Sequence, residues 1–346
     1  MRLKDLTAVM FLVVSAACAG GSAGVSDGPV DLSGGVQSEK LHLLFDRYFE
    51  EYLELNPVFA TFIGDNRYND RFANNIGPEH RNASLALEKT YLEALGKIGS
   101  KELRGQDLLS YEVFKRRREV AIEGFRFPSH LIPVNQFYSV PNSFTQMGSG
   151  GGIHPFRTEK DYRDFLGRID GFETWVDQAI ANMREGIAKG IVQPRVLMEK
   201  TIPQLDSQIT ETPQASLFYQ PIKNFPEGMS PAVRKELTEK YTAAIQDRII
   251  PAYKKLRDFI QADYLPRARD SVGLKALPDG SAWYAYLARR STTTDLSPAE
   301  IHRIGLAEVK RIRGEMERVK GEGEFDGDLR AFFDFLNENP DFYFDD

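Results

Sequence analysis

The stretch "TEKDYRDFLGRIDGFETWVDQAIANMREGIAKG", from Thr158 to Gly190, decides the fold class of this chain. Apolar residues recur along it every three or four positions, which places them on one side of a helix. These residues are Tyr162, Phe165, Ile169, Phe172, Val176, Ile180, Met183 and Ile187. Thr158 is suited to cap the first turn, and Gly190 is suited to end the helix. We therefore predict one long amphipathic helix whose apolar side lies in the core.

The same spacing recurs on both sides of this stretch. It predicts helices over 39–55, 79–98, 107–123 and 230–269, with Pro251 kinking the last of them. Another helix begins after Ser297, where Ser297 and Glu300 form a capping box around Pro298. The sequence therefore predicts a mainly α, bundle-like scaffold of many helices, with at most a small β element.

Two segments depart from this pattern. Residues 127–155 hold four prolines and the run "MGSGGGIHP", so we predict an irregular segment. It is either a mobile surface loop or the lining of a cleft. The segment from Ala282 to Thr294 is rich in Trp, Tyr and Thr, which predicts a β-strand.

Composition excludes one broad class of partner. The chain has 346 residues and a formal net charge of −6, whereas nucleic-acid binding needs a concentrated basic face. The short basic run from Lys115 to Arg118 lies within a predicted helix. We interpret it as a solvated helix face, with a phosphate site as the alternative. No nucleic-acid partner is expected.

The N-terminus predicts export. Arg2 and Lys4 precede an uncharged, largely apolar run that ends in "VSAACAGG", and Cys18 is the single cysteine of the chain. This order is typical of a secretory signal, and small residues around a cysteine are typical of a lipoprotein processing site. We predict a signal peptide over 1–18 with lipid attached to Cys18, a flexible linker over 19–38 and a helical domain over 39–346. The expected location is the cell envelope, with the membrane contacted through the lipid anchor. The alternative is an ordinary signal peptide with an incidental cysteine.

No catalytic or metal-binding motif is found in the sequence. In "TTTDLSPAEIHRIG", His302 follows Glu300, but no residue three or four positions away can share a zinc ion with it. The other histidines are equally isolated: His42, His80, His130 and His154. We therefore predict no metal ligand, no catalytic residue and no cofactor within this chain.

Three long stretches resemble one bacterial family. They are "FDRYFEEYLELNPVFATFIGDNRYNDR", "RIDGFETWVDQAIANMREGIAKGIVQPRVLMEKTIPQLD" and "GSAWYAYLARRSTTTDLSPAEIHRIGLAEVKRIRGEME". Together they resemble the family known as domain of unknown function 885. The resemblance implies a largely helical protein, often exported or lipid-anchored, that is similar to gluzincin-type zinc metallopeptidases. The motif that would hold zinc in this family, His-Glu-Gly-x-Pro-Gly-His-His, is absent from the sequence, so zinc is expected only if a further C-terminal part is supplied.

The resemblance also suggests where a ligand would bind. In gluzincins an edge strand binds the peptide backbone by strand addition, and the predicted strand is the candidate here. Tyr284, Tyr286 and Thr293 are therefore candidate residues for binding a peptide, the alternative being that they only pack the strand.

We thus expect an exported, metallopeptidase-like protein that lacks its zinc site and is inactive alone. It would represent the N-terminal portion of a larger domain, as a truncated or fragmentary product. The alternative is a non-catalytic helical module that binds a peptide or an envelope ligand. The aromatic end, Phe342 to Phe344, predicts association through exposed apolar surface.

Overall fold

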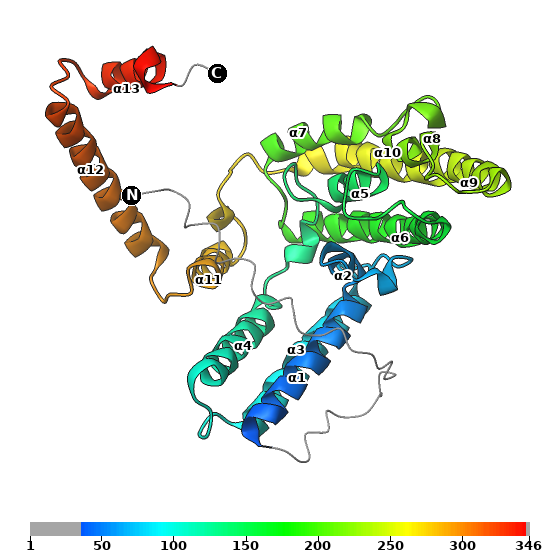
Figure 1. The fold of residues 1–346 in the computed structure, drawn as a ribbon, viewed down its shortest axis with the longest axis horizontal. Coiled ribbons are helices and arrows are strands. Elements are labelled where there is room, and N and C mark those ends of the chain that lie inside the picture. The colour runs from blue at the N-terminus through cyan, green and yellow to red at the C-terminus, as the bar shows by residue number, and fades with distance from the viewer. Residues whose placement is uncertain (1–35, 344–346) are drawn as a thin grey trace.

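The computed structural model describes residues 36–343 and is built from helices (Figure 1). The α-helices are α1 (Gln37–Leu55), α2 (Pro57–Phe62), α3 (Pro78–Ile98), α4 (Gly105–Gly124), α5 (Val140–Gly148), α6 (Glu159–Lys189), α7 (Arg195–Asp206), α8 (Gln220–Lys223), α9 (Pro231–Ala244), α10 (Ile250–Phe259), α11 (Gly280–Thr292), α12 (Pro298–Glu322) and α13 (Leu329–Glu338). Over these residues the only β pairing is an isolated bridge between Pro194 and Arg269. The predicted mainly α fold is confirmed.

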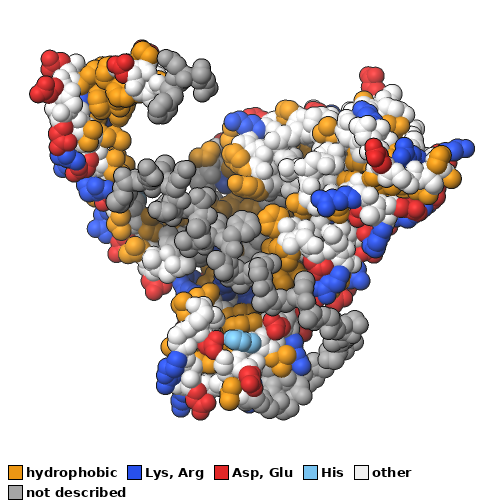
Figure 2. All heavy atoms as spheres, in the orientation of Figure 1, with side chains coloured by type: hydrophobic (Ala, Val, Ile, Leu, Met, Phe, Trp, Pro, Cys, Tyr) orange, Lys and Arg blue, Asp and Glu red, His pale blue; other side chains and the backbone are white. Residues whose placement is uncertain are grey.

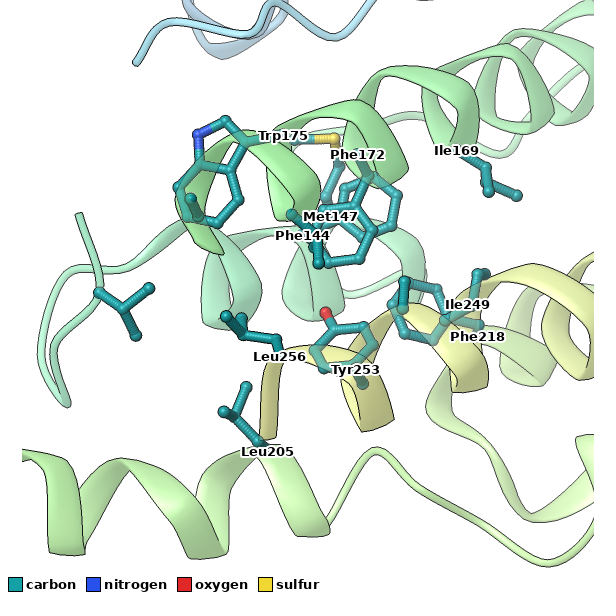
Figure 3. Packing of buried hydrophobic residues seen from close by; sticks show 14 of the residues in the cluster. Phe144, Met147, Ile169, Phe172, Trp175, Leu205, Phe218, Ile249, Tyr253 and Leu256 are labelled. Carbon is teal, nitrogen blue, oxygen red and sulfur yellow. The ribbon is translucent and has the colours of Figure 1, made fainter. Parts of the chain in front are cut away.

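Helix α6 forms as its sequence predicts and organises the larger core. The Thr158 side chain accepts a hydrogen bond from the Asp161 amide at its start, and Gly190 adopts the left-handed conformation at its end. The apolar side of α6 packs against α5, α9 and α10 (Figure 3). There the rings of Phe144 and Phe172 stack with centroids 4.0 Å apart. Burying each such ring contributes about 2–3 kcal/mol.

A second bundle, of α1, α3 and α4, lies beside this block (Figure 1). Its core includes Leu41, Leu44 and Tyr91. At its edge Arg118 of α4 is buried, forms an ion pair with Glu88 and lies over the ring of Tyr48. The interpretation of the Lys115–Arg118 run as a solvated face was therefore wrong for Arg118, because the neighbouring helices supply a carboxylate and an aromatic ring for its guanidinium.

A second buried arginine joins α6 to the residues around α2. Arg168 is 0% exposed, and none of its hydrogen-bond acceptors is a carboxylate. Its guanidinium donates to His154 Nδ1 at 3.0 Å, Asn69 Oδ1 at 3.2 Å and the Arg71 carbonyl at 3.2 Å, and also to Thr61 Oγ1. We refer to Arg168 and these four partners as the Arg168 network. It holds the segment around α2 on α6 through polar contacts within the protein.

Two prolines lie directly after π-helical segments. Ile245–Ile249 precedes Pro251, and Ile260–Tyr264 precedes Pro266. A proline inside a helix lacks an N–H group and its ring clashes with the carbonyl four residues earlier. A wider π turn moves that carbonyl away. The predicted helix over 230–269 thus forms as α9 and α10. One π turn links the two helices, and a second π turn follows α10.

Two sequence predictions need correction. The predicted strand from Ala282 to Thr294 is instead helix α11, because Trp283 and Tyr286, three residues apart, share the helix side that packs on Phe127. Residues 127–155 are not a mobile surface loop. They contain a 3-10 turn at Ser129–Leu131 and the helix α5, which buries Phe144 and Met147.

Helices α12 and α13 extend away from the rest of the protein (Figure 1). The capping box of Ser297 and Glu300 forms, and His302 is exposed. Figure 2 shows hydrophobic side chains along the inner side of this arm and charged side chains along its outer side. The exposed apolar residues include Val309, Ile312, Met316, Val319 and Phe333. Association through this end of the chain stays a prediction, and Phe344 lies outside the described residues.

The predicted signal peptide and Cys18 also lie outside the described residues, as does most of the predicted linker. Helix α1 begins at Gln37, so the last two residues of the segment 19–38 are helical. Among residues 36–343, no helix combines the length and the apolar character needed to cross a membrane.

Candidate functional site

A cavity of about 690 Å³ opens between the second half of α4, the helix α11 and the start of α3. The segment that follows α4 completes its wall with Phe127, Ser129 and His130. The beginning of the 127–155 segment therefore lines a cleft, which was one of its two predicted roles.

Aromatic side chains form one wall of this cavity. Phe127 stacks on Trp283 with ring centroids 5.9 Å apart, and it contacts Tyr286 with centroids 5.0 Å apart. The Tyr286 hydroxyl donates to the Val120 carbonyl at 3.0 Å, which attaches α11 to α4. A Cβ added at Gly124 would lie 2.4 Å from the Tyr286 hydroxyl, so the two helices approach closely here. This aromatic cluster of Phe127, Trp283 and Tyr286 gives the cavity a rigid apolar surface.

Arginines make up much of the remaining lining. Six of them line the cavity, and no aspartate or glutamate of residues 36–343 does. This arginine cluster consists of Arg81, Arg116, Arg117, Arg118, Arg289 and Arg290. Its residues come from three different helices, α3, α4 and α11.

Only two arginines of the cluster are neutralised by a nearby carboxylate. Arg118 pairs with Glu88, and Arg289 pairs with Glu123 at 2.5 Å. The other four form no ion pair with any acidic residue within 36–343: Arg81, Arg116, Arg117 and Arg290. Unpaired positive charges that share one cavity repel each other, and a bound anion would relieve that repulsion.

The pKa of Arg81 shows that its charged form is destabilised in this environment. Burial lowers the pKa of Arg81, and the nearby carboxylate of Glu185 opposes this shift only in part. Glu185 forms its ion pair with Lys189 instead. The charged form of Arg81 is therefore stabilised less than that of an ordinary surface arginine.

Three buried polar atoms of residues that line the cavity have no hydrogen-bond partner within the described part of the chain. They are Nδ1 of His130 and both Nε and Nη1 of Arg118, of which Nε contacts Glu88 as an ion pair. A buried polar atom without a partner costs about 1–3 kcal/mol. Unsatisfied hydrogen-bonding capacity thus lies in residues of the same cavity as the positive charge.

The three residues proposed from sequence fall in different places. Tyr286 lines the cavity but is 5% exposed, and its hydroxyl is already bonded to Val120. Thr293 lines the cavity at the end of α11, where its backbone is left-handed. Tyr284 is 45% exposed and does not line the cavity. Since these residues belong to a helix, whose backbone groups bond to each other, strand addition to them is not available.

The histidines do not fit a zinc site. His154 accepts from Arg168, His80 contacts the Leu55 carbonyl and His42 contacts Asp107. Over residues 36–343, no three histidine, cysteine or acidic side chains gather closely enough to hold a metal ion.

Comparison with known proteins places the chain in a family. Residues 57–346 match the family model described as "Bacterial protein of unknown function (DUF885)". The chain belongs to the DUF885 family. No curated protein matches the sequence significantly.

A solved structure similar to this DUF885 protein is that of "the putative lipoprotein from Colwellia psychrerythraea", with 20% sequence identity and a TM-score of 0.72. The match covers 90% of this chain and 56% of that one, so the chain spans little more than half the length of this solved relative. At this identity the similarity shows a shared fold.

Most of the arginine cluster was not found from the sequence. The basic run at 115–118 was visible, with a phosphate site as its alternative interpretation, and Arg289–Arg290 stand side by side in the chain. No sequence signal, however, brings α3, α4 and α11 of this DUF885 protein together. The cluster depends on that tertiary contact.

Proposed function

We propose that this DUF885 chain is a non-catalytic binding scaffold and that the arginine cluster holds an anionic ligand. The observation that carries this proposal is the group of four arginines without a carboxylate partner in one cavity of about 690 Å³. On this proposal the chain has the helical scaffold of a metallopeptidase-like protein without holding zinc itself. A peptide would bind through its terminal carboxylate rather than by strand addition.

The shape of the cavity supports a small ligand. Small-molecule sites are typically concave, about 300–1,000 Å³ in volume, and combine apolar surface with a few placed polar groups. Here the aromatic cluster supplies the apolar surface and the arginine cluster supplies the polar groups. Arginine is well suited to this role because its planar guanidinium binds two oxygen atoms at once.

Replacing both Arg116 and Arg117 with glutamine is expected to weaken binding of anions at least ~10-fold, because each charge-assisted hydrogen bond contributes about 1.5–3 kcal/mol. Isothermal titration calorimetry measures this with a panel of carboxylates, inorganic phosphate and short peptides with free C-termini. The matched control is the double variant Arg303→Gln, Arg311→Gln, in two exposed arginines of α12 outside the cavity.

Binding should survive a metal chelator, since arginines rather than metal ligands line the cavity. The proposal fails if no member of the panel binds, or if the Arg116, Arg117 double variant binds as tightly as the unmodified protein.

We further propose that the protein is exported to the cell envelope and anchored there by lipid on Cys18. The support is the basic start, the apolar run and the single cysteine between small residues. The expected result is a mature protein that begins with a lipidated Cys18, detected by mass spectrometry of the membrane fraction. A mature N-terminus at Ala19 or later would exclude the lipid anchor, and an intact Met1 would exclude processing.

A further inference from the structure

We propose that the ligand of the arginine cluster is a phosphate monoester or pyrophosphate, with its organic part on the aromatic cluster. This proposal rests on the proposed function and specifies the chemical class of the ligand. The number of charges, the kind of cation and the position of the aromatic cluster support it.

The charges in the cavity favour a ligand with more than one negative charge. Of the six arginines, Arg118 and Arg289 form ion pairs with Glu88 and Glu123, and the other four form none with an acidic residue within 36–343. A carboxylate or a sulfate ester carries one negative charge, so it would leave most of this charge uncompensated. A phosphate monoester carries about −1.5 to −2 at pH 7 and presents three acceptor oxygens. It therefore matches the cavity better than a monoanion.

The kind of cation in the cavity also favours a phosphate group as the ligand. All the cationic residues that line the cavity are arginines, although Lys115 directly precedes three of them in the sequence. Guanidinium groups bind phosphate oxygens in pairs, with a defined geometry that an ammonium group lacks.

The surroundings limit the size of the ligand. The arginines lie in one cavity beside Phe127, Trp283 and Tyr286, and the whole chain has a net charge of −6. A nucleic-acid strand needs an extended basic surface to follow its backbone. A single phosphate group on an apolar or aromatic body fits this arrangement, whether that body is a soluble metabolite or the acyl part of a lipid.

The test compares phenyl phosphate with phenyl sulfate, which has the same shape but carries only one negative charge. Calorimetry at pH 7.5 with the purified full chain should give a Kd for phenyl phosphate at least ~10-fold below the values for phenyl sulfate and benzoate. The Arg116→Gln, Arg117→Gln double variant should lose this preference, whereas the Arg303→Gln, Arg311→Gln control should keep it.

Lowering the pH to 5.5 provides a second readout. Phosphate monoesters lose a negative charge near pH 6, so the affinity for phenyl phosphate should fall relative to that for phenyl sulfate, which does not titrate. The ratio of the two affinities is the relevant quantity, because both ligands are measured on the same protein at the same pH.

Dihexanoyl phosphatidic acid, a soluble lipid with a phosphate monoester head, distinguishes the two sources of phosphate. Binding tighter than that of phenyl phosphate would assign the site to a lipid headgroup, and weaker binding would assign it to a soluble phosphate ester. Equal binding of phenyl sulfate, benzoate and phenyl phosphate would overturn the inference but leave the proposed function intact. Failure of every anion to bind would overturn both.

Discussion

Replacing Arg168 with methionine is expected to lower the free energy of unfolding by about 3 kcal/mol or more. Arg168 is fully buried, and its guanidinium donates to acceptors in the segment around α2 and to His154 before α6. Methionine fills part of the space but donates no hydrogen bond. His154 Nδ1 and the Arg71 carbonyl would then lose their donor, at a cost of about 1–3 kcal/mol for each unsatisfied group, whereas Asn69 Oδ1 keeps the hydrogen bond from the Thr61 hydroxyl.

Removing a buried charge without an ion pair offsets part of this loss. Burial already lowers the pKa of Arg168 to about 10, so its charged form is costly, but it is fully charged at neutral pH. Against the total stability of 5–15 kcal/mol that is usual for folded proteins, the expected change is large. Urea denaturation followed by circular dichroism at pH 7.5 measures it.

Arg163→Met, on the same helix, is the matched control. Arg163 is partly exposed and pairs with Glu159 and Glu236 at the surface, so its replacement should cost less than about 1 kcal/mol. Arg168→Lys tests the geometry of the network: a lysine keeps the charge but cannot reach all the acceptors, so it should also destabilise. A change below 0.5 kcal/mol for Arg168→Met would show that the network is not needed for the fold.

The protein is expected to lose stability as the pH falls from about 6.5 to 4, because His154 remains neutral in the folded state. Burial lowers the pKa of His154 from 6.5 to about 4, and the charge of Arg168 acts in the same direction. The backbone carbonyl of Asp161 accepts a hydrogen bond from Nε2, which raises the pKa of His154 and opposes the shift. The charge of Lys160 lowers this pKa further. The neutral ring thus donates from Nε2 and accepts from Arg168 at Nδ1.

The direction of this change in stability with pH follows from where the protons bind. Below pH 6.5 the unfolded chain binds a proton at His154 and the folded protein does not, so stability falls with pH until about pH 4. The contribution of this residue is fully present above pH 6.5, and about 3 kcal/mol of it is lost by pH 4.

Other groups titrate over the same range, so the measurement is a difference between two proteins. The free energy of unfolding is measured from pH 7.5 to pH 4.5 for the unmodified chain and for His154→Gln, whose side-chain oxygen can still accept from Arg168. The variant should show the shallower dependence on pH. Parallel curves for the two proteins would show that His154 is protonated equally in the folded and unfolded states.

Local sequence rules account well for the helices that begin and end with clear capping residues. Thr158 and Gly190 delimit α6, and Ser297 with Glu300 begins α12, as the sequence predicts. The reason is that a cap satisfies backbone groups within four residues of itself. The apolar stripe of α6 likewise predicts its buried side, because helical periodicity depends on neighbouring residues alone.

The same reasoning failed where the outcome depends on partners distant in the sequence. The β propensity of Trp283 and Tyr286 predicted a strand, yet packing on Phe127 places both on one side of α11. Strand propensity expresses how a side chain fits its surroundings, and these surroundings come from another part of the chain.

Charged residues depend most on distant partners, because a basic residue is expected at the surface unless its partners are known. The mainly α class, the ends of the main helices and the resemblance to the DUF885 family follow from the sequence alone. The burial of Arg118 and Arg168, and the presence of Arg81, Arg116 and Arg290 in one cavity, follow only from the tertiary structure. Helix periodicity is a property of adjacent residues, whereas the solvation of a charge depends on every group that the fold brings near it.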